Sequence, residues 1–196
     1  MAPLKAYRVS SLAGKPNFDS VPVAKITDYP LEQRDYKPFA QAILCLGDGN
    51  LYLRMWAFEV SPPDGSSLCC VMYPYPTKPE LAFSVEITHG SDSAKVSLFL
   101  IEGGERKNLD IPVQVSAHNG EDLQGVYWGA TVSLPIAALE KSGGKTAFKS
   151  GNSFPGNFYK LCAAPNWKHM GSHFPAIFPG GAYTQGSMGE FIVVSY

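Results

Sequence analysis

Short runs of apolar, β-branched and aromatic residues follow one another along the chain, separated by turns rich in glycine and proline. Runs of this length with such boundaries predict β-strands rather than helices. About nine of them lie beyond residue 38. The predicted strands span residues 39–46, 51–60, 67–73, 80–88, 94–101, 109–115, 123–134, 154–162 and 190–196.

Turn residues support this division. Asp48-Gly49 lies between two strand-like runs and predicts a tight hairpin, and Asn119-Gly120 predicts another turn. Only residues 135–141 suit a helix, with Ser133 as its cap and Gly143-Gly144 as its stop. One or two helical turns cannot cover a sheet.

No alternation of strands and helices appears, and no internal repeat is visible. The pattern therefore predicts an all-β protein, an antiparallel β-sandwich of about nine to ten strands with one short helical turn. With 196 residues, the chain is expected to form a single domain, residues 1–196. Residues 1–38 contain five prolines and look irregular. Only residues 5–12 and 21–26 look extended there, and we expect this segment to wrap over a sheet edge.

Composition narrows the function. The net charge of −1 gives no attraction to phosphate backbones or anionic membranes, so neither nucleic acid nor a membrane is an expected partner. The four cysteines form no disulfide-like ladder and are expected to be reduced. The sequence as it stands has no signal peptide, which predicts a cytoplasmic protein, or an extracellular one if an export signal had been removed.

Motifs for catalysis, metals and cofactors are weak. Residues 141–146 resemble the end of a phosphate-binding loop, but Leu139 stands where that loop needs glycine. His169 and His173 have the spacing of a zinc pair on a helix, yet the surrounding prolines and glycine argue against a helix. No nucleophile or paired carboxylates can be named. We therefore expect no enzyme activity, no cofactor and no metal, and take both histidines as partly exposed loop residues.

The long loop at residues 163–189 is the best candidate for binding. Loops of this length are usually either disordered or functional, and the many aromatic residues here argue against disorder. Trp167 lies there beside Asn166, with His173, Tyr183 and Gln185 further along. Flat rings among polar groups suit a sugar, whose C–H face stacks on a ring while its hydroxyls find hydrogen-bonding partners. The alternative is that the loop folds over the sheet and buries these rings.

Several segments, in this order, resemble the family 9 carbohydrate-binding modules and the wider DOMON-like group. The likeness covers roughly residues 39–196. The segments are residues 48–54 (DGNLYLR), 67–76 (SLCCVMYPYP), 80–86 (ELAFSVE), 126–135 (VYWGATVSLP), 156–162 (GNFYKLC) and 188–192 (MGEFI). The resemblance implies a bacterial β-sandwich of about ten antiparallel strands that accompanies glycan-degrading enzymes and binds sugar.

The chain departs from that family at its sugar clamp. Sugar-binding members hold a terminal sugar between two tryptophans, one before the 67–76 strand and one before the last strand. Here the loop 61–66 has no aromatic residue, and Tyr183 stands near the second place. The resemblance therefore implies the fold more directly than it implies the pocket.

The resulting hypothesis is a non-catalytic carbohydrate-binding domain. Trp167 and Tyr183 would supply the ring stack, and the three polar residues Asn166, His173 and Gln185 would bind hydroxyls. Two alternatives stay open: a structural or protein-interaction sandwich that binds no sugar, including one that forms a homo-oligomer, and a small glycan-active enzyme.

Overall fold

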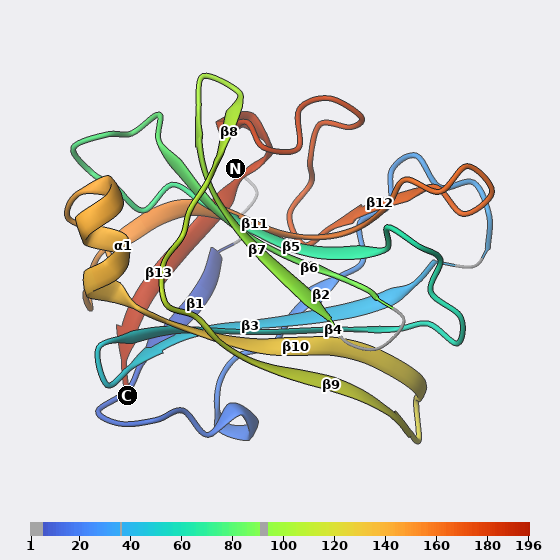
Figure 1. Ribbon diagram of the computed structural model, residues 1–196, viewed down its shortest axis with the longest axis horizontal. Coiled ribbons are helices and arrows are strands. Elements are labelled where there is room, and N and C mark those ends of the chain that lie inside the picture. Colours follow the sequence, from blue (N-terminus) through green and yellow to red (C-terminus); the bar gives the residue numbers. More distant parts are fainter. Residues whose placement is uncertain (1–5, 36, 91–93) are drawn as a thin grey trace.

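The computed structural model describes residues 6–35, 37–90 and 94–196, and within them it contains thirteen strands and one α-helix (Figure 1). The helix, α1, spans Ile136–Gly143. Two 3-10 turns lie at Phe18–Ser20 and Gln185–Ser187. The strands are β1 (Ala6–Ser11), β2 (Ala24–Ile26), β3 (Phe39–Gly47), β4 (Asn50–Phe58), β5 (Ser67–Met72), β6 (Ala82–Thr88), β7 (Lys95–Glu102), β8 (Glu105–Asn108), β9 (Gln114–Asp122), β10 (Gly125–Pro135), β11 (Ser153–Cys162), β12 (His169–Ser172) and β13 (Gly189–Ser195).

The strands belong to one hydrogen-bonded sheet, in the order β8-β7-β6-β5-β11-β13-β1-β3-β4-β10-β9, with β12 on β11 and β2 on β3. The sheet curls over, so that β5, β6, β7 and β11 lie above β3, β4, β10 and β9 in Figure 1. The main core fills the space between these two layers. It includes fully buried side chains from both, among them Leu53, Phe83 and Phe191.

The all-β prediction is confirmed. The predicted antiparallel arrangement of nine to ten strands is wrong, because the sheet is mixed and contains parallel pairs. β1 runs parallel to both of its neighbours, β13 and β3. It therefore lies inside the sheet, where a wrap over an edge was expected. Parallel pairing joins segments far apart in the sequence, so no local turn signal announces it. The two extended runs expected near the N-terminus do correspond to β1 and β2.

Local signals were most accurate at the first hairpin. Asp48 and Gly49 both have positive φ, 47° and 72°, as the predicted tight turn requires. The helix also lies where it was expected; its last residue is Gly143, and Gly144 follows as the C-cap with a φ of 104°. Ser133 does not cap it. Its first amide, that of Ile136, is bonded instead to the carbonyl of Gly49 at 3.0 Å, which ties the helix to the hairpin.

The predicted turn at Asn119-Gly120 is wrong, because both residues lie within β9 and pair with β10. The strand predicted at residues 109–115 is also misplaced, because most of these residues form the connection between β8 and β9. The glycine has a packing role: a Cβ at Gly120 would lie 2.9 Å from the Tyr127 hydroxyl. Sequence alone cannot distinguish this use of glycine from a turn.

All four cysteines are free and buried, and adjacent Cys69 and Cys70 show that β5 is covered on both faces. Cys70 lies in the main core, whereas Cys69 packs in a second cluster with Tyr159 and Ala182. The second cluster is closed by residues that follow β12, including Phe178 and Tyr183. The outer side of this layer is therefore partly sealed by the long C-terminal loop.

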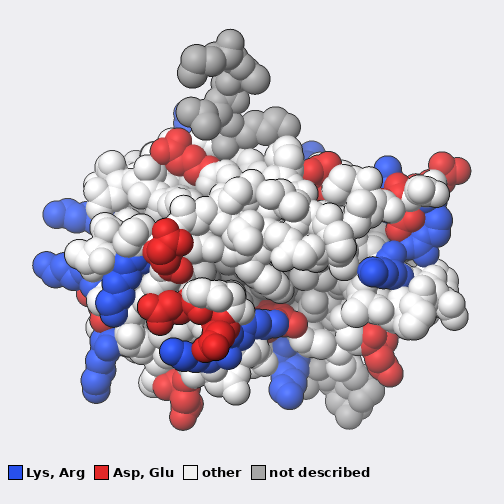
Figure 2. Space-filling view, turned by 90° about the horizontal axis from the view of Figure 1, so that it is seen from above, with Lys and Arg blue, Asp and Glu red and all other residues white. Residues whose placement is uncertain are grey.

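Figure 2 shows the molecule from above, on the side of the β7–β8 hairpin. A broad uncharged area lies beside a group in which side chains of both signs adjoin one another, and other charged side chains lie at the margins. No single sign of charge dominates this face, in keeping with the net charge of −1.

Candidate binding site

A hollow of about 310 Å³ lies at the end of the molecule where β4 ends and β12 begins. We call it the Trp167 hollow. The Trp167 side chain is 55% exposed, which is unusual for so large an apolar ring. The residues lining the hollow are Arg34, Glu59, Val60, Ser61, Pro63, Trp167 and His169.

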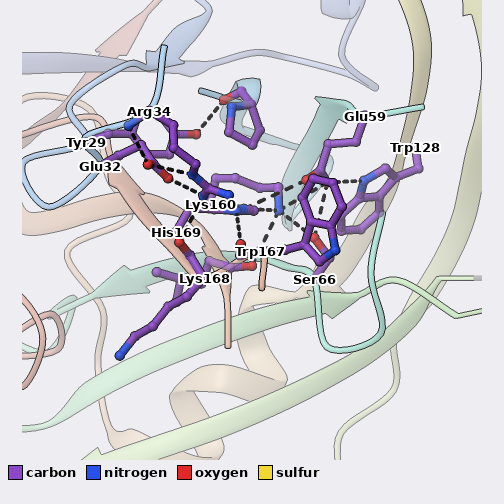
Figure 3. A network of polar contacts seen from close by, with 12 residues as sticks. Tyr29, Glu32, Arg34, Glu59, Ser66, Trp128, Lys160, Trp167, Lys168 and His169 are labelled. Atoms are coloured by element: carbon purple, nitrogen blue, oxygen red, sulfur yellow. Dashed lines mark hydrogen bonds and ion pairs between the residues drawn. The ribbon is translucent and has the colours of Figure 1, made fainter. Parts of the chain in front are cut away.

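The floor of the Trp167 hollow is a buried carboxylate. Glu59 follows β4 directly, and its side chain is only 5% exposed. Its Oε2 atom accepts hydrogen bonds from Trp128 Nε1 at 2.8 Å and Ser66 Oγ at 3.1 Å, and lies 3.2 Å from Lys160 Nζ (Figure 3). Its Oε1 atom makes no hydrogen bond to the described residues, although it lies 3.8 Å from His169 Nε2. One carboxylate oxygen is therefore fully used and the other retains capacity to accept.

Lys160 completes the network from the neighbouring layer. Its side chain is 0% exposed, and its Nζ atom lies 2.6 Å from Ser66 Oγ and 2.9 Å from His169 Nε2, besides Glu59. These three acceptors match the three N–H groups of an ammonium ion. Burial lowers the pKa of Lys160, and the neighbouring Glu59 carboxylate opposes that shift.

His169 connects the network to the Trp167 backbone. Lys160 donates to its Nε2, so its Nδ1 carries the proton and donates to the Trp167 carbonyl at 2.7 Å. Burial, with the adjacent Lys160 charge, lowers the pKa of His169 to about 4, which makes the ring neutral at neutral pH. The expectation of a partly exposed loop histidine is wrong here, because His169 is buried at the start of β12.

Arg34 fixes the segment that carries the exposed indole. Its guanidinium donates to the carbonyls of Asn166 at 3.4 Å and Lys168 at 3.1 Å, on either side of Trp167. Glu32 holds the guanidinium in turn, and the hydrogen bond from Arg34 lowers the pKa of Glu32 to about 2. The position of Trp167 is thus set from both sides, by Arg34 and by His169.

The structure separates the residues that the sequence analysis grouped. Trp167 lines the Trp167 hollow, whereas Asn166 is not one of its lining residues and contributes only a backbone carbonyl that accepts from Arg34. Tyr183 and Gln185 line a different hollow of about 360 Å³, which we call the Tyr183 hollow. His173 lines neither; its Nδ1 lies 2.8 Å from the Lys25 carbonyl, and its ring packs 4.5 Å from Phe174. Part of the loop 163–189 is therefore open to solvent, and part of it folds over the sheet and buries its rings.

Sequence reasoning missed Arg34, Glu59, Lys160 and His169 as parts of one site. Only Lys160 carried a local signal, since a charged residue interrupts the apolar strand between Tyr159 and Leu161. Burial of a lysine requires a partner, but nothing in the sequence identifies Glu59 as that partner. The contact joins residues 101 positions apart (160 − 59).

Among the residues that the structure describes, no group of three or more His, Cys, Asp or Glu side chains has the geometry to hold a metal ion. Within the same residues, no helix has the length and apolar character needed to cross a bilayer.

Comparison of the whole chain with known proteins rests on structure, since no family model and no curated protein matches the sequence. A protein from Bacteroides uniformis proposed to bind carbohydrate superposes with a TM-score of 0.73 at 14% identity, covering 96% of this chain and 99% of that one. The fold is like that of family 9 carbohydrate-binding modules. Such a module from Caldicellulosiruptor kristjanssonii superposes with TM-scores of 0.52 in its glucose complex and 0.53 in its cellotriose complex, each at 12% identity. The alignments cover 96% of this chain in both cases, and 96% and 94% of the module.

This likeness confirms the family-9-like fold that the ordered segments implied. The loop 61–66, where the resemblance would place an aromatic residue, contributes Ser61 and Pro63 to the Trp167 hollow instead.

Proposed function

We propose that this chain is a non-catalytic carbohydrate-binding domain, and that the sugar binds in the Trp167 hollow. The observation that carries the proposal is an exposed indole beside a buried carboxylate that keeps one oxygen free. The fold supports it, because the similar Caldicellulosiruptor module is known in complex with glucose and with cellotriose.

Each part of the hollow suits one part of a pyranose ring. The C–H-rich face of the sugar packs on the Trp167 indole, whose backbone segment is held by Arg34 and His169 and therefore loses little backbone entropy on binding. Glu59 Oε1 accepts a hydroxyl proton, and a hydrogen bond to a charged group is stronger than one between neutral groups. Ser61 and Arg34 line the same hollow and offer further hydrogen bonds.

The Tyr183 hollow is the second place where sugar could bind. Two of its polar side chains are already engaged, since Gln185 Nε2 donates to the Pro79 carbonyl at 2.7 Å and Arg106 is paired with Glu86 beside the Tyr183 ring. Tyr183 also packs against Tyr159 in the second cluster. These contacts favour a structural role for this half of the loop and leave Trp167 as the stacking residue.

Calorimetry with glucose and cellotriose tests the proposal. We expect binding in the millimolar to micromolar range, and Trp167→Ala should weaken it by about tenfold or more, equivalent to about 1.4 kcal/mol. Tyr196→Ala, which removes another exposed aromatic ring far from the hollow in sequence, should leave the affinity unchanged.

A third variant separates the two hollows. Gln185→Ala should have no effect if sugar binds beside Trp167. A loss of affinity in Gln185→Ala with none in Trp167→Ala would move the site to the Tyr183 hollow. Absence of binding to any mono- or oligosaccharide at tens of millimolar would contradict the function itself.

A further inference from the structure

A third hollow, of about 210 Å³, lies on the outer face of β3, β4, β10 and β9, away from the core. We call it the Gly129 hollow. Residues that follow β1 cover only part of this face, where Leu12 and Phe18 pack against Ile43 and Tyr52. Figure 1 shows this segment running beneath the layer on the side that carries α1. The hollow lies beyond the covered part and shares no lining residue with the Trp167 hollow.

The strand register explains why the face is hollowed there. Gly129 on β10 pairs with Trp56 on one side and His118 on the other, and directly paired residues point to the same face. A Cβ at Gly129 would lie 2.0 Å from the Met55 carbonyl oxygen, so β10 approaches β4 too closely for any larger residue, and no side chain from this position stands between the Trp56 indole and the His118 imidazole. Tyr127, two residues away on β10, walls the gap and lies across Gly120.

Arg54 brings a positive charge to this hollow, which the Asp122 carboxylate also lines without reaching ion-pair distance of the guanidinium. Its guanidinium carbon lies 5.3 Å from the Trp56 ring centroid and 5.5 Å from that of Phe18, so two rings hold it. Among the described residues no carboxylate lies within ion-pair distance of it, and its Nε is buried without a hydrogen-bond partner. A half-buried cation left unpaired is uncommon and favours binding of an anion.

The other polar groups around the hollow are neutral or lie at its rim. Burial, together with the nearby Arg54 charge, lowers the pKa of His118, so its ring is neutral at neutral pH and Arg54 is the cation among the residues that line the hollow. His118 Nε2 is paired with the Thr131 hydroxyl at 2.7 Å. Asp122 and Gln124 line the hollow with Gln41 and can bind hydroxyl groups.

We propose that the Gly129 hollow binds an acidic sugar, a uronic acid unit whose carboxylate pairs with Arg54 and whose ring packs against Trp56 and Tyr127. Aromatic walls with hydroxyl-binding groups at the rim suit a sugar ring rather than a bare anion. The volume is below that of pockets for drug-sized ligands, as one ring requires. This site lies on a different face from the Trp167 hollow and does not depend on it.

Titration of the full chain with sodium glucuronate, glucose and sodium acetate tests the proposal. We expect glucuronate to bind at least tenfold more tightly than either glucose or acetate at this hollow, because only glucuronate has both the ring and the charge. Arg54→Gln should reduce the glucuronate affinity by about tenfold or more, whereas the charge-matched surface variant Lys145→Gln should not change it. Far-ultraviolet circular dichroism checks that each variant is folded.

Amide chemical shifts of the unmodified protein give a second readout that needs no variant. Glucuronate should shift the amide signals of Gly129 and His118 and leave that of Trp167 in place. Equal affinity for glucose and glucuronate, equal affinity for acetate and glucuronate, or shifts confined to the Trp167 hollow would each overturn the proposal. So would the absence of any glucuronate binding. Failure of glucose and cellotriose to bind at Trp167 would remove the site proposed for them without affecting this one.

Discussion

Buried charge is the feature that most distinguishes individual residues of this chain. Glu59, Lys160 and His169 lie together where two layers meet, and each polar hydrogen of the lysine has an acceptor. Such a network stabilises the fold only when all of its members are present, because removing one member leaves another charge buried and unpaired. Lys160 within an apolar strand is a local sign of a buried ion pair, but it does not identify the partners. Its partners depend on the way the chain folds.

The pH dependence of stability tests the state of His169. Its pKa is about 4 in the folded chain against 6.5 for an unperturbed histidine, so between these values only the unfolded chain takes up a proton at this site. The stability contributed by the neutral ring is complete above the unfolded value and is lost as the pH falls from 6.5 toward 4. We expect the unfolding free energy to drop over this interval by more in the wild type than in His169→Gln.

Urea unfolding of both proteins at about pH 7 and about pH 5 measures that difference. Because carboxylates elsewhere titrate alike in both proteins, the comparison isolates His169. Parallel pH profiles for the two proteins would show that this ring titrates normally and is not held neutral by burial and Lys160.

At the scale of elements, glycines that look alike in the sequence have different structural roles. Gly49 permits the tight turn between β3 and β4, and the Asp-Gly pattern predicted it. Gly120 and Gly143 are contact residues, since each leaves room for a tyrosine ring from a neighbouring element. Gly143 was interpreted as part of a helix stop, but it is the last residue of α1 and is fully inside the packing.

The variant Gly143→Ala separates helix propensity from packing. Alanine is the better helix former by about 1 kcal/mol, which alone would stabilise α1. A Cβ at Gly143 would, however, lie 2.2 Å from the buried Tyr75 ring. We expect this overlap to dominate and to lower the unfolding free energy by about 1–3 kcal/mol.

Ser142→Ala serves as the control, because Ser142 is an exposed neighbour in the same helix. Denaturant melts of the two variants compare them directly. A stabilised Gly143→Ala would mean that α1 does not dock against Tyr75.

At the scale of the whole molecule, β1 joins the two layers. It lies between β13 and β3, and its residues Tyr7 and Val9 point into the main core. The Tyr7 hydroxyl accepts from the Leu44 amide at 3.0 Å and donates to the Pro22 carbonyl at 2.8 Å. Six residues therefore connect the first part of the chain to its last strand and to β3.

A chain that begins at residue 12 tests this role. We expect it to lose cooperative thermal unfolding, because both β13 and β3 would have an unpaired edge and the core a gap. Adding a peptide of residues 6–11 should restore the near-ultraviolet circular dichroism signal by supplying the missing strand. A shortened chain that still melts cooperatively without the peptide would contradict a joining role for β1.

The sequence by itself determined the all-β class, the positions of most strands, the Asp48-Gly49 hairpin and the short helix, because these depend on local periodicity and turn chemistry. It also pointed to Trp167. Tertiary structure alone decided that β1 pairs in parallel inside the sheet and that Tyr183 packs apart from Trp167. It also placed Glu59, Lys160 and His169 beneath the exposed indole. Those outcomes depend on contacts between distant segments, and a buried charge or a glycine gap has meaning only once its neighbours across the sheet are in place.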